Sequence, residues 1–147
     1  MKFILLVFAS IIFSNPTYAD QGKLDVTKAI DVQLVSDEWL GEKNLVTLLK
    51  KFPKPCSELL AKAERFKKVS FVKVRVLKAI SLLNCDNKAK LINEYFNDTN
   101  IPVKAESIIS AKSLSKQERL KFASKVAKLK KSTKDPLLLS AIKSFEN

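Results

Sequence analysis

Residues 56–85 read CSELLAKAERFKKVSFVKVRVLKAISLLNC, and this stretch decides the fold class. It contains two segments, about 57–67 and 71–83, whose apolar residues recur at three- and four-residue spacing, as they do on one face of an α-helix. Those positions are Leu59, Leu60, Ala63, Phe66, Val72, Val76, Ala79, Ile80 and Leu83. The stretch therefore predicts two consecutive helices that form an antiparallel hairpin.

The rest of the chain extends the same pattern. Further helices are predicted over about 36–52, 88–97, 102–109, 115–131 and 136–145, which makes six or seven antiparallel helices in an all-α domain spanning residues 36–147. Only Gly22 and Gly41 follow residue 19, too few glycines for the many tight turns of an all-β chain. Residues 20–35 are left as an unassigned N-terminal arm, because the alternation at Ile30, Val32 and Leu34 fits either a short strand or an irregular segment.

Three of the predicted helices have recognisable N-terminal signals. Pro102 stands in a first turn, where its missing amide hydrogen costs nothing. Ser115 and Glu118 have the S-x-x-E spacing of a capping box. Asp135 followed by Pro136 is an N-cap residue before a first-turn proline, so a final helix is predicted to begin there.

The first 19 residues have the pattern of a secretory signal peptide. Lys2 precedes an apolar run that ends at Phe13, and Pro16 is followed by Thr-Tyr-Ala, with small residues at the minus-three and minus-one positions. The run is shorter than the roughly 20 apolar residues of a membrane-spanning helix. Cleavage is predicted after Ala19, with export to the periplasm or the extracellular space.

Charge and cysteine content narrow the possibilities further. Cleavage would remove one lysine and no acid, which lowers the formal net charge from +12 to +11 and favours either an anionic partner or a role of the lysines in solubility. Cys56 and Cys85 are the only cysteines, they lie at the two ends of the predicted hairpin that should meet, and an oxidising compartment favours their pairing. A disulfide between them is predicted to close the hairpin and to be structural.

The helices from residue 56 onward fall into three pairs whose second members begin near Phe71, Pro102 and Pro136. The separations of 31 and 34 residues lie in the range of helix-pair repeats. The chain from Cys56 to Phe145 resembles a degenerate HEAT-type repeat, although only the last pair has Asp-Pro and no pair has a full Val-Arg step with downstream alanines. The resemblance implies a short α-solenoid that presents a surface to a partner; the alternative is a compact helical bundle.

The sequence contains no constellation that identifies a reaction. It has no histidine, which removes the commonest general base, and no glycine-rich phosphate loop or metal-ligand cluster. The carboxylates Glu94, Asp98 and Glu106 lie among lysines on predicted amphipathic helices, where solvated ion pairs are the usual arrangement. We expect a protein that is not an enzyme, with no cofactor, metal or small-molecule substrate.

The clearest surface feature is a basic ridge on the predicted helix 115–131. Its expected partner-binding residues are Lys116, Arg119, Lys121, Lys125, Lys128 and Lys131. An apolar side is expected from Leu120, Ala123, Val126, Ala127 and Leu129. A second basic group consists of Lys62, Arg65, Lys67, Lys68, Lys73, Arg75 and Lys78.

These surfaces predict a binding protein that engages an acidic protein through a basic helical face, for example as an immunity or inhibitor protein. The alternative is an envelope-associated protein that binds anionic lipid or cell-wall glycan. Nucleic acid is a poor partner for an exported protein rich in lysine relative to arginine.

Overall fold

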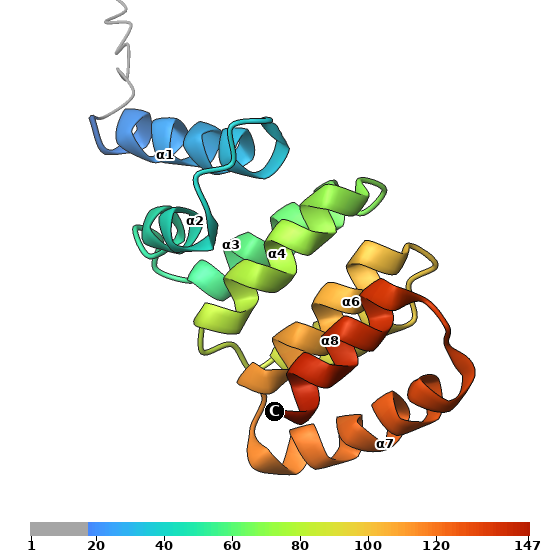
Figure 1. Cartoon of the computed structure of the whole chain (residues 1–147). Coiled ribbons are helices and arrows are strands. Elements are labelled where there is room, and N and C mark those ends of the chain that lie inside the picture. Colours follow the sequence, from blue (N-terminus) through green and yellow to red (C-terminus); the bar gives the residue numbers. More distant parts are fainter. Residues whose placement is uncertain (1–17) are drawn as a thin grey trace, which may run out of the picture.

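The structure, a computed structural model, describes residues 18–147, with side chains from residue 25 onward. This part of the chain is all-α, as predicted, and contains eight α-helices, one 3-10 turn and no strand (Figure 1). The helices are α1 (Tyr18–Val35), α2 (Glu42–Leu49), α3 (Pro55–Arg65), α4 (Ser70–Leu82), α5 (Lys88–Phe96), α6 (Ile101–Ser110), α7 (Lys116–Ser132) and α8 (Pro136–Glu146), with the 3-10 turn at Ala111–Ser113. The predicted signal peptide lies outside the described residues except for its last two, which begin α1.

The N-terminal arm is the first difference from the sequence-based expectation. It is helical throughout, so neither a strand nor an irregular arm forms there. Ile30 and Leu34 are fully buried one helical turn apart, whereas Val32 is 55% exposed, so the apolar alternation is accommodated by a helix with one valine facing outward. The predicted count of six or seven helices was therefore too low.

The predicted helix over residues 36–52 is shorter than expected. Residues 36–41 form a loop, and α2 begins only after Gly41, whose φ of 95° lies in the left-handed region that favours glycine. The Gln33 side chain accepts a hydrogen bond from the Leu40 amide at 3.3 Å, and the Ser36 hydroxyl accepts one from the Glu38 amide at 3.0 Å. These local bonds compete with helical ones and hold the loop against the end of α1.

The hairpin of α3 and α4 and its disulfide agree with the prediction. Cys56, in the first turn of α3, is bonded to Cys85, which lies just beyond α4, with 5.7 Å between their Cα atoms. The predicted helix starts are also confirmed: Ser115 and Glu118 form a complete capping box, and Asp135 accepts hydrogen bonds from the Leu137 and Leu138 amides.

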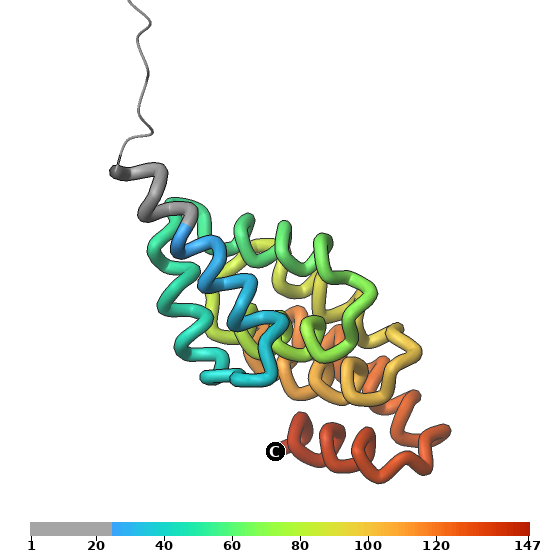
Figure 2. Tube along the Cα trace, turned by 90° about the horizontal axis from the view of Figure 1, so that it is seen from above, coloured from blue at the N-terminus to red at the C-terminus, as the bar shows by residue number. Residues whose placement is uncertain are grey.

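The helices contact one another in a regular order. Each of the pairs α1–α2, α3–α4, α5–α6 and α7–α8 is in contact, and the second members α2, α4, α6 and α8 pack on one another in sequence. Figure 1 shows α4, α6 and α8 side by side, and Figure 2 shows the array extending from α1 and α2 at one end to α7 and α8 at the other. The core between these helices is aliphatic, with Leu77, Ile80 and Ile108 fully buried. Helix α7 lies at the end of the array, so one of its sides is not covered by another helix.

Candidate binding surfaces

Helix α7 is attached to the array mainly through two side chains. Phe122 and Val126 are its only buried residues, with exposed fractions of 1% and 2%. The Phe122 ring packs edge-on against Phe96 of α5 and Phe145 of α8, with centroid separations of 5.1 and 5.9 Å. The apolar side expected for this helix is partly wrong, because Leu120 and Ala127 are exposed and the buried stripe runs through Phe122 instead.

The six cations predicted to bind a partner are all exposed on α7. Lys125 donates a hydrogen bond from Nζ to the Asn93 side-chain oxygen at 2.8 Å. The other five, Lys116, Arg119, Lys121, Lys128 and Lys131, have no ion-pair partner among the described residues. Their charges are therefore available to a partner.

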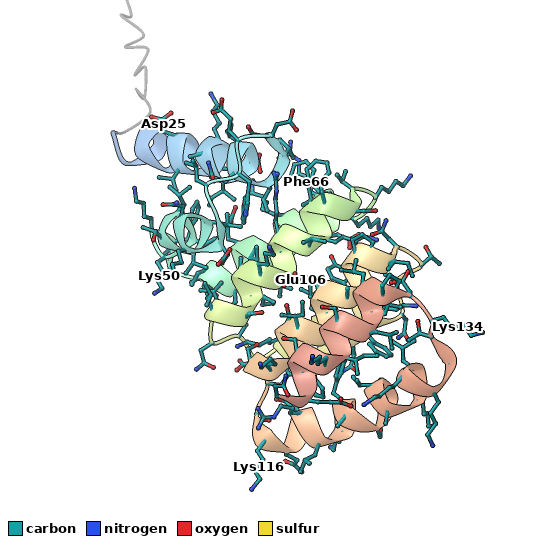
Figure 3. All side chains as sticks on the ribbon, in the orientation of Figure 1. Asp25, Lys50, Phe66, Glu106, Lys116 and Lys134 are labelled. Atoms are coloured by element: carbon teal, nitrogen blue, oxygen red, sulfur yellow. A yellow bond between two sulfur atoms is a disulfide. The ribbon has the colours of Figure 1, made fainter. Side chains whose placement is uncertain are left out.

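These cations occupy two edges of α7 and not a single ridge. At 100° per residue, Lys121, Lys125 and Lys128 lie within about 60° of one another on one edge. Lys116 and Arg119 lie on the opposite edge, across the buried stripe, and Lys131 points outward between the two. Figure 3 shows Lys116 at the start of α7 and Lys134 just beyond its end.

Most of the protein's net charge is concentrated around this helix. Residues 112–134 contain nine basic residues and one acidic residue, Glu118, which gives +8 of the total +12. The pKa of the Glu118 carboxyl is lowered, chiefly by the hydrogen bond from the Ser115 hydroxyl within the capping box. The single acid of this surface is thus ionised, and its carboxylate is engaged in the capping box at the start of α7.

The second basic group has a different role, because most of its members hold helices together. Lys62, 6% exposed, contacts Asp31 of α1 at 2.6 Å, and Arg65 contacts the other oxygen of the same carboxylate at 3.0 Å. Lys73 contacts Asp98 at 2.6 Å. Burial alone would raise the pKa of the Asp98 carboxyl, but hydrogen bonds from Lys73 and the Asn100 amide hold it below its usual range.

Arg75 is also structural. Its Nη1 atom donates to the backbone oxygens of Gln33, Leu34 and Ser36 at 2.7 to 3.3 Å, which satisfies carbonyls at the C-terminal end of α1. Its guanidinium lies over the Trp39 ring and over the Phe71 ring, 4.9 and 5.0 Å from their centroids. The arginine thus fixes the α1–α2 loop on α4.

Beside this stack lies a hollow of about 410 Å³ that the sequence analysis missed. Trp39, Phe71, Val74 and Pro102 contribute apolar walls, and Arg75 and Lys78 contribute charge, together with Ser70 and Asn100. The residues come from three separate segments, so no local sequence signal identifies them as neighbours. Lys78 also borders a second hollow of about 580 Å³ that contains Glu42 and Glu106.

The three carboxylates considered for chemistry do not form one site. Asp98 pairs with Lys73, Glu94 lines a hollow between α3 and α5 with Lys67 and Lys90, and Glu106 lies in the hollow with Lys78. Burial raises the pKa of the Glu106 carboxyl, although Lys78 and a hydrogen bond from Ser110 act in the opposite direction. Figure 3 shows Glu106 between α4 and α8, away from the charges of α7.

A fourth hollow, of about 390 Å³, lies between α7 and the end of α8. It is lined by Lys112, Arg119, Leu120, Ala123, Phe145, Glu146 and Asn147. Lys112 donates a hydrogen bond from Nζ to the Ser144 carbonyl at 3.0 Å, and Glu146 pairs with Lys130 at 2.8 Å. We refer to it as the α7–α8 hollow.

In comparisons with known proteins, no family model, curated protein or solved structure matches the chain. Within residues 18–147, no group of histidine, cysteine, aspartate and glutamate side chains is arranged to hold a metal ion. None of the helices in that part is long and apolar enough to cross a membrane.

Proposed function

We propose that this protein is an exported, non-enzymatic binding protein that engages an acidic protein through the cations of α7. An immunity or inhibitor protein that covers the active site of an antagonistic enzyme is the most concrete form of this function. The three helix pairs from α3 to α8 would act as a short, HEAT-like α-solenoid that holds α7 at its end. Export would bring the chain to an oxidising compartment, which is consistent with the Cys56–Cys85 disulfide.

The observation that carries the proposal is the contrast between two sets of cations. Lys62, Lys73 and Arg75 are held by acids or carbonyls within the fold. Of the seven cations on α7, only Lys130 has an ion pair within the described part of the chain, and the net charge of residues 112–134 is +8. Solubility alone would be served by charges of both signs spread over the surface.

Charge of this kind acts mainly on the rate of association. A concentrated positive patch attracts an acidic partner over a distance set by the Debye length, about 8 Å at physiological ionic strength. The association rate should therefore fall steeply with added salt, whereas the dissociation rate should change less. A rate that does not depend on salt would contradict the proposed role of α7.

The experiment is affinity capture with the oxidised protein lacking residues 1–19. One variant reverses Lys121, Lys125 and Lys128 to glutamate. A matched control reverses Lys50, Lys51 and Lys54, three exposed lysines near α2, so both variants have the same net charge. The proposal predicts that one acidic protein is retained by the wild type and by the control and is lost from the α7 variant.

Anionic lipid or glycan is the competing class of partner. The test is co-sedimentation with anionic vesicles, neutral vesicles and cell-wall material. Binding to anionic vesicles but not neutral ones, or to cell-wall material, that is lost in the α7 variant alone would mean that the partner is the envelope and not a protein. Equal loss in both variants would mean that net charge, and not α7, determines binding.

A further inference from the structure

Leu120 has an unexpected position on α7. It is 66% exposed, the highest value among the large apolar residues that the structure describes, and at 100° per residue it points about 160° away from Phe122. It therefore contributes little to the core. A single exposed leucine is ordinary, but this one borders a hollow that is lined by both apolar and cationic side chains.

The α7–α8 hollow combines two chemical characters. Its apolar part consists of Leu120 and Ala123 from α7 and the Phe145 ring from α8, which Phe122 supports from the core side. Its cationic part consists of Arg119, without an ion pair among the described residues, and Lys112. The one acidic side chain there, Glu146, is already paired with Lys130.

We propose that the α7–α8 hollow receives a large apolar side chain from an acidic segment of the protein partner. The side chain would lie against Leu120 and Phe145, and carboxylates next to it in the partner would contact Arg119 and Lys116. This inference rests on the proposed function and specifies it, because it states that the partner segment is both acidic and apolar.

The cationic and the apolar side chains of the hollow would contribute differently to recognition of a partner. Exposed charges accelerate encounter with any acidic surface but discriminate little between such surfaces. A desolvated apolar anchor within a charged rim supplies the discrimination. At about 390 Å³ the hollow is large enough for one such side chain. Arg119 lines it, and Lys116 lies on the same edge of α7, which favours a protein segment that brings carboxylates to this edge.

The test uses two synthetic acidic peptides of equal length and charge, which differ only in a central leucine or serine. Their dissociation constants for the oxidised full chain are measured by fluorescence anisotropy at low salt. The leucine peptide should bind about tenfold more tightly, as expected for partial burial of one leucine side chain.

Two variants locate this difference. Leu120→Ser removes one wall, and Ala123→Trp fills the hollow; in both, the two peptides should bind equally. The matched control is Leu40→Ser, because Leu40 is 64% exposed in the α1–α2 loop; it should keep the tenfold preference. Far-ultraviolet circular dichroism checks that each variant is folded, and the Leu120→Ser result alone suffices if Ala123→Trp unfolds.

Two outcomes would overturn the inference. Equal affinity of both peptides for the wild type would show that the hollow takes no apolar anchor, and salt-sensitive binding of both would still leave the charge-based function intact. A preference for the leucine peptide that persists in Leu120→Ser and Ala123→Trp would place the anchor elsewhere. The capture experiment with Lys121, Lys125 and Lys128 reversed tests the proposed function independently of either result.

Discussion

At the residue scale, identical side chains have different roles depending on partners that lie far away in the sequence. Lys62 meets Asp31 and Lys73 meets Asp98, across separations of 31 and 25 residues. From the sequence alone both lysines belong to a basic surface group, because no nearby residue indicates these partners. The exposed lysines of α7 could be predicted, since a capping box and a helical period fix that helix locally.

The ion pair between Asp31 and Lys62 should matter for stability. Asp31→Ala leaves the Lys62 ammonium, 6% exposed, with only Glu58 at 3.8 Å. We expect the free energy of unfolding to fall by about 3 kcal/mol, as for other buried pairs that lose one partner. Urea denaturation measures this, with Glu64→Gln as the control because its pair with Lys67 is exposed; an equal effect of both would contradict the assignment.

The Asp98 carboxylate gives a pH-dependent prediction. Its pKa is lowered in the folded state, so its contribution is complete above about pH 5 and is lost as the pH falls through that lowered pKa. Asp98→Asn should therefore reduce the free energy of unfolding by about 1–3 kcal/mol at neutral pH. The gap between variant and wild type should narrow in urea titrations at about pH 2.5. A difference in the free energy of unfolding that widens on acidification would contradict a lowered pKa of Asp98.

At the scale of elements, α7 shows why periodicity alone placed only part of its buried side correctly. The helix has apolar residues at two sets of positions, one through Phe122 and Val126 and one through Leu120 and Ala123. Both sets fit the helical period. Only the positions of Phe96 and Phe145, contributed by α5 and α8, decide that Phe122 is the side chain that packs.

The two apolar sets should respond differently to truncation. Phe122→Ala removes the ring at the centre of the aromatic contacts and should lower the free energy of unfolding by about 3–5 kcal/mol. Leu120→Ala removes an exposed side chain and should change it by less than about 0.5 kcal/mol. Thermal or urea denaturation distinguishes them. Comparable losses for the two variants would mean that α7 packs through Leu120.

At the scale of the whole molecule, seven of the eight helices followed from period, proline and capping signals. The exception, α1, was missed because its helical spacing at Ile30 and Leu34 overlaps a strand-like alternation with Val32. Its docking depends on Asp31 and on carbonyls bound by Arg75, contacts that no local pattern reveals. The hollows were missed for the same reason, because each is assembled from separate segments.

The disulfide should stabilise the whole array through the α3–α4 hairpin. It joins residues 29 apart, and on the chain-entropy model closing such a loop contributes about 3–4 kcal/mol. Replacing Cys56 and Cys85 together by serine should lower the free energy of unfolding by that amount while preserving helix content at room temperature. A double variant as stable as the oxidised wild type would contradict the structural role of the bond.

The proposed binding surface consists of exposed cations on α7, a helix at the end of the array. The measurement that tests its role most directly is the amount of acidic protein captured by the wild type, the Lys121, Lys125 and Lys128 reversal and the Lys50, Lys51 and Lys54 reversal. We expect capture by the first and third and loss from the second. Equal capture by all three would contradict the claim that α7 binds the partner.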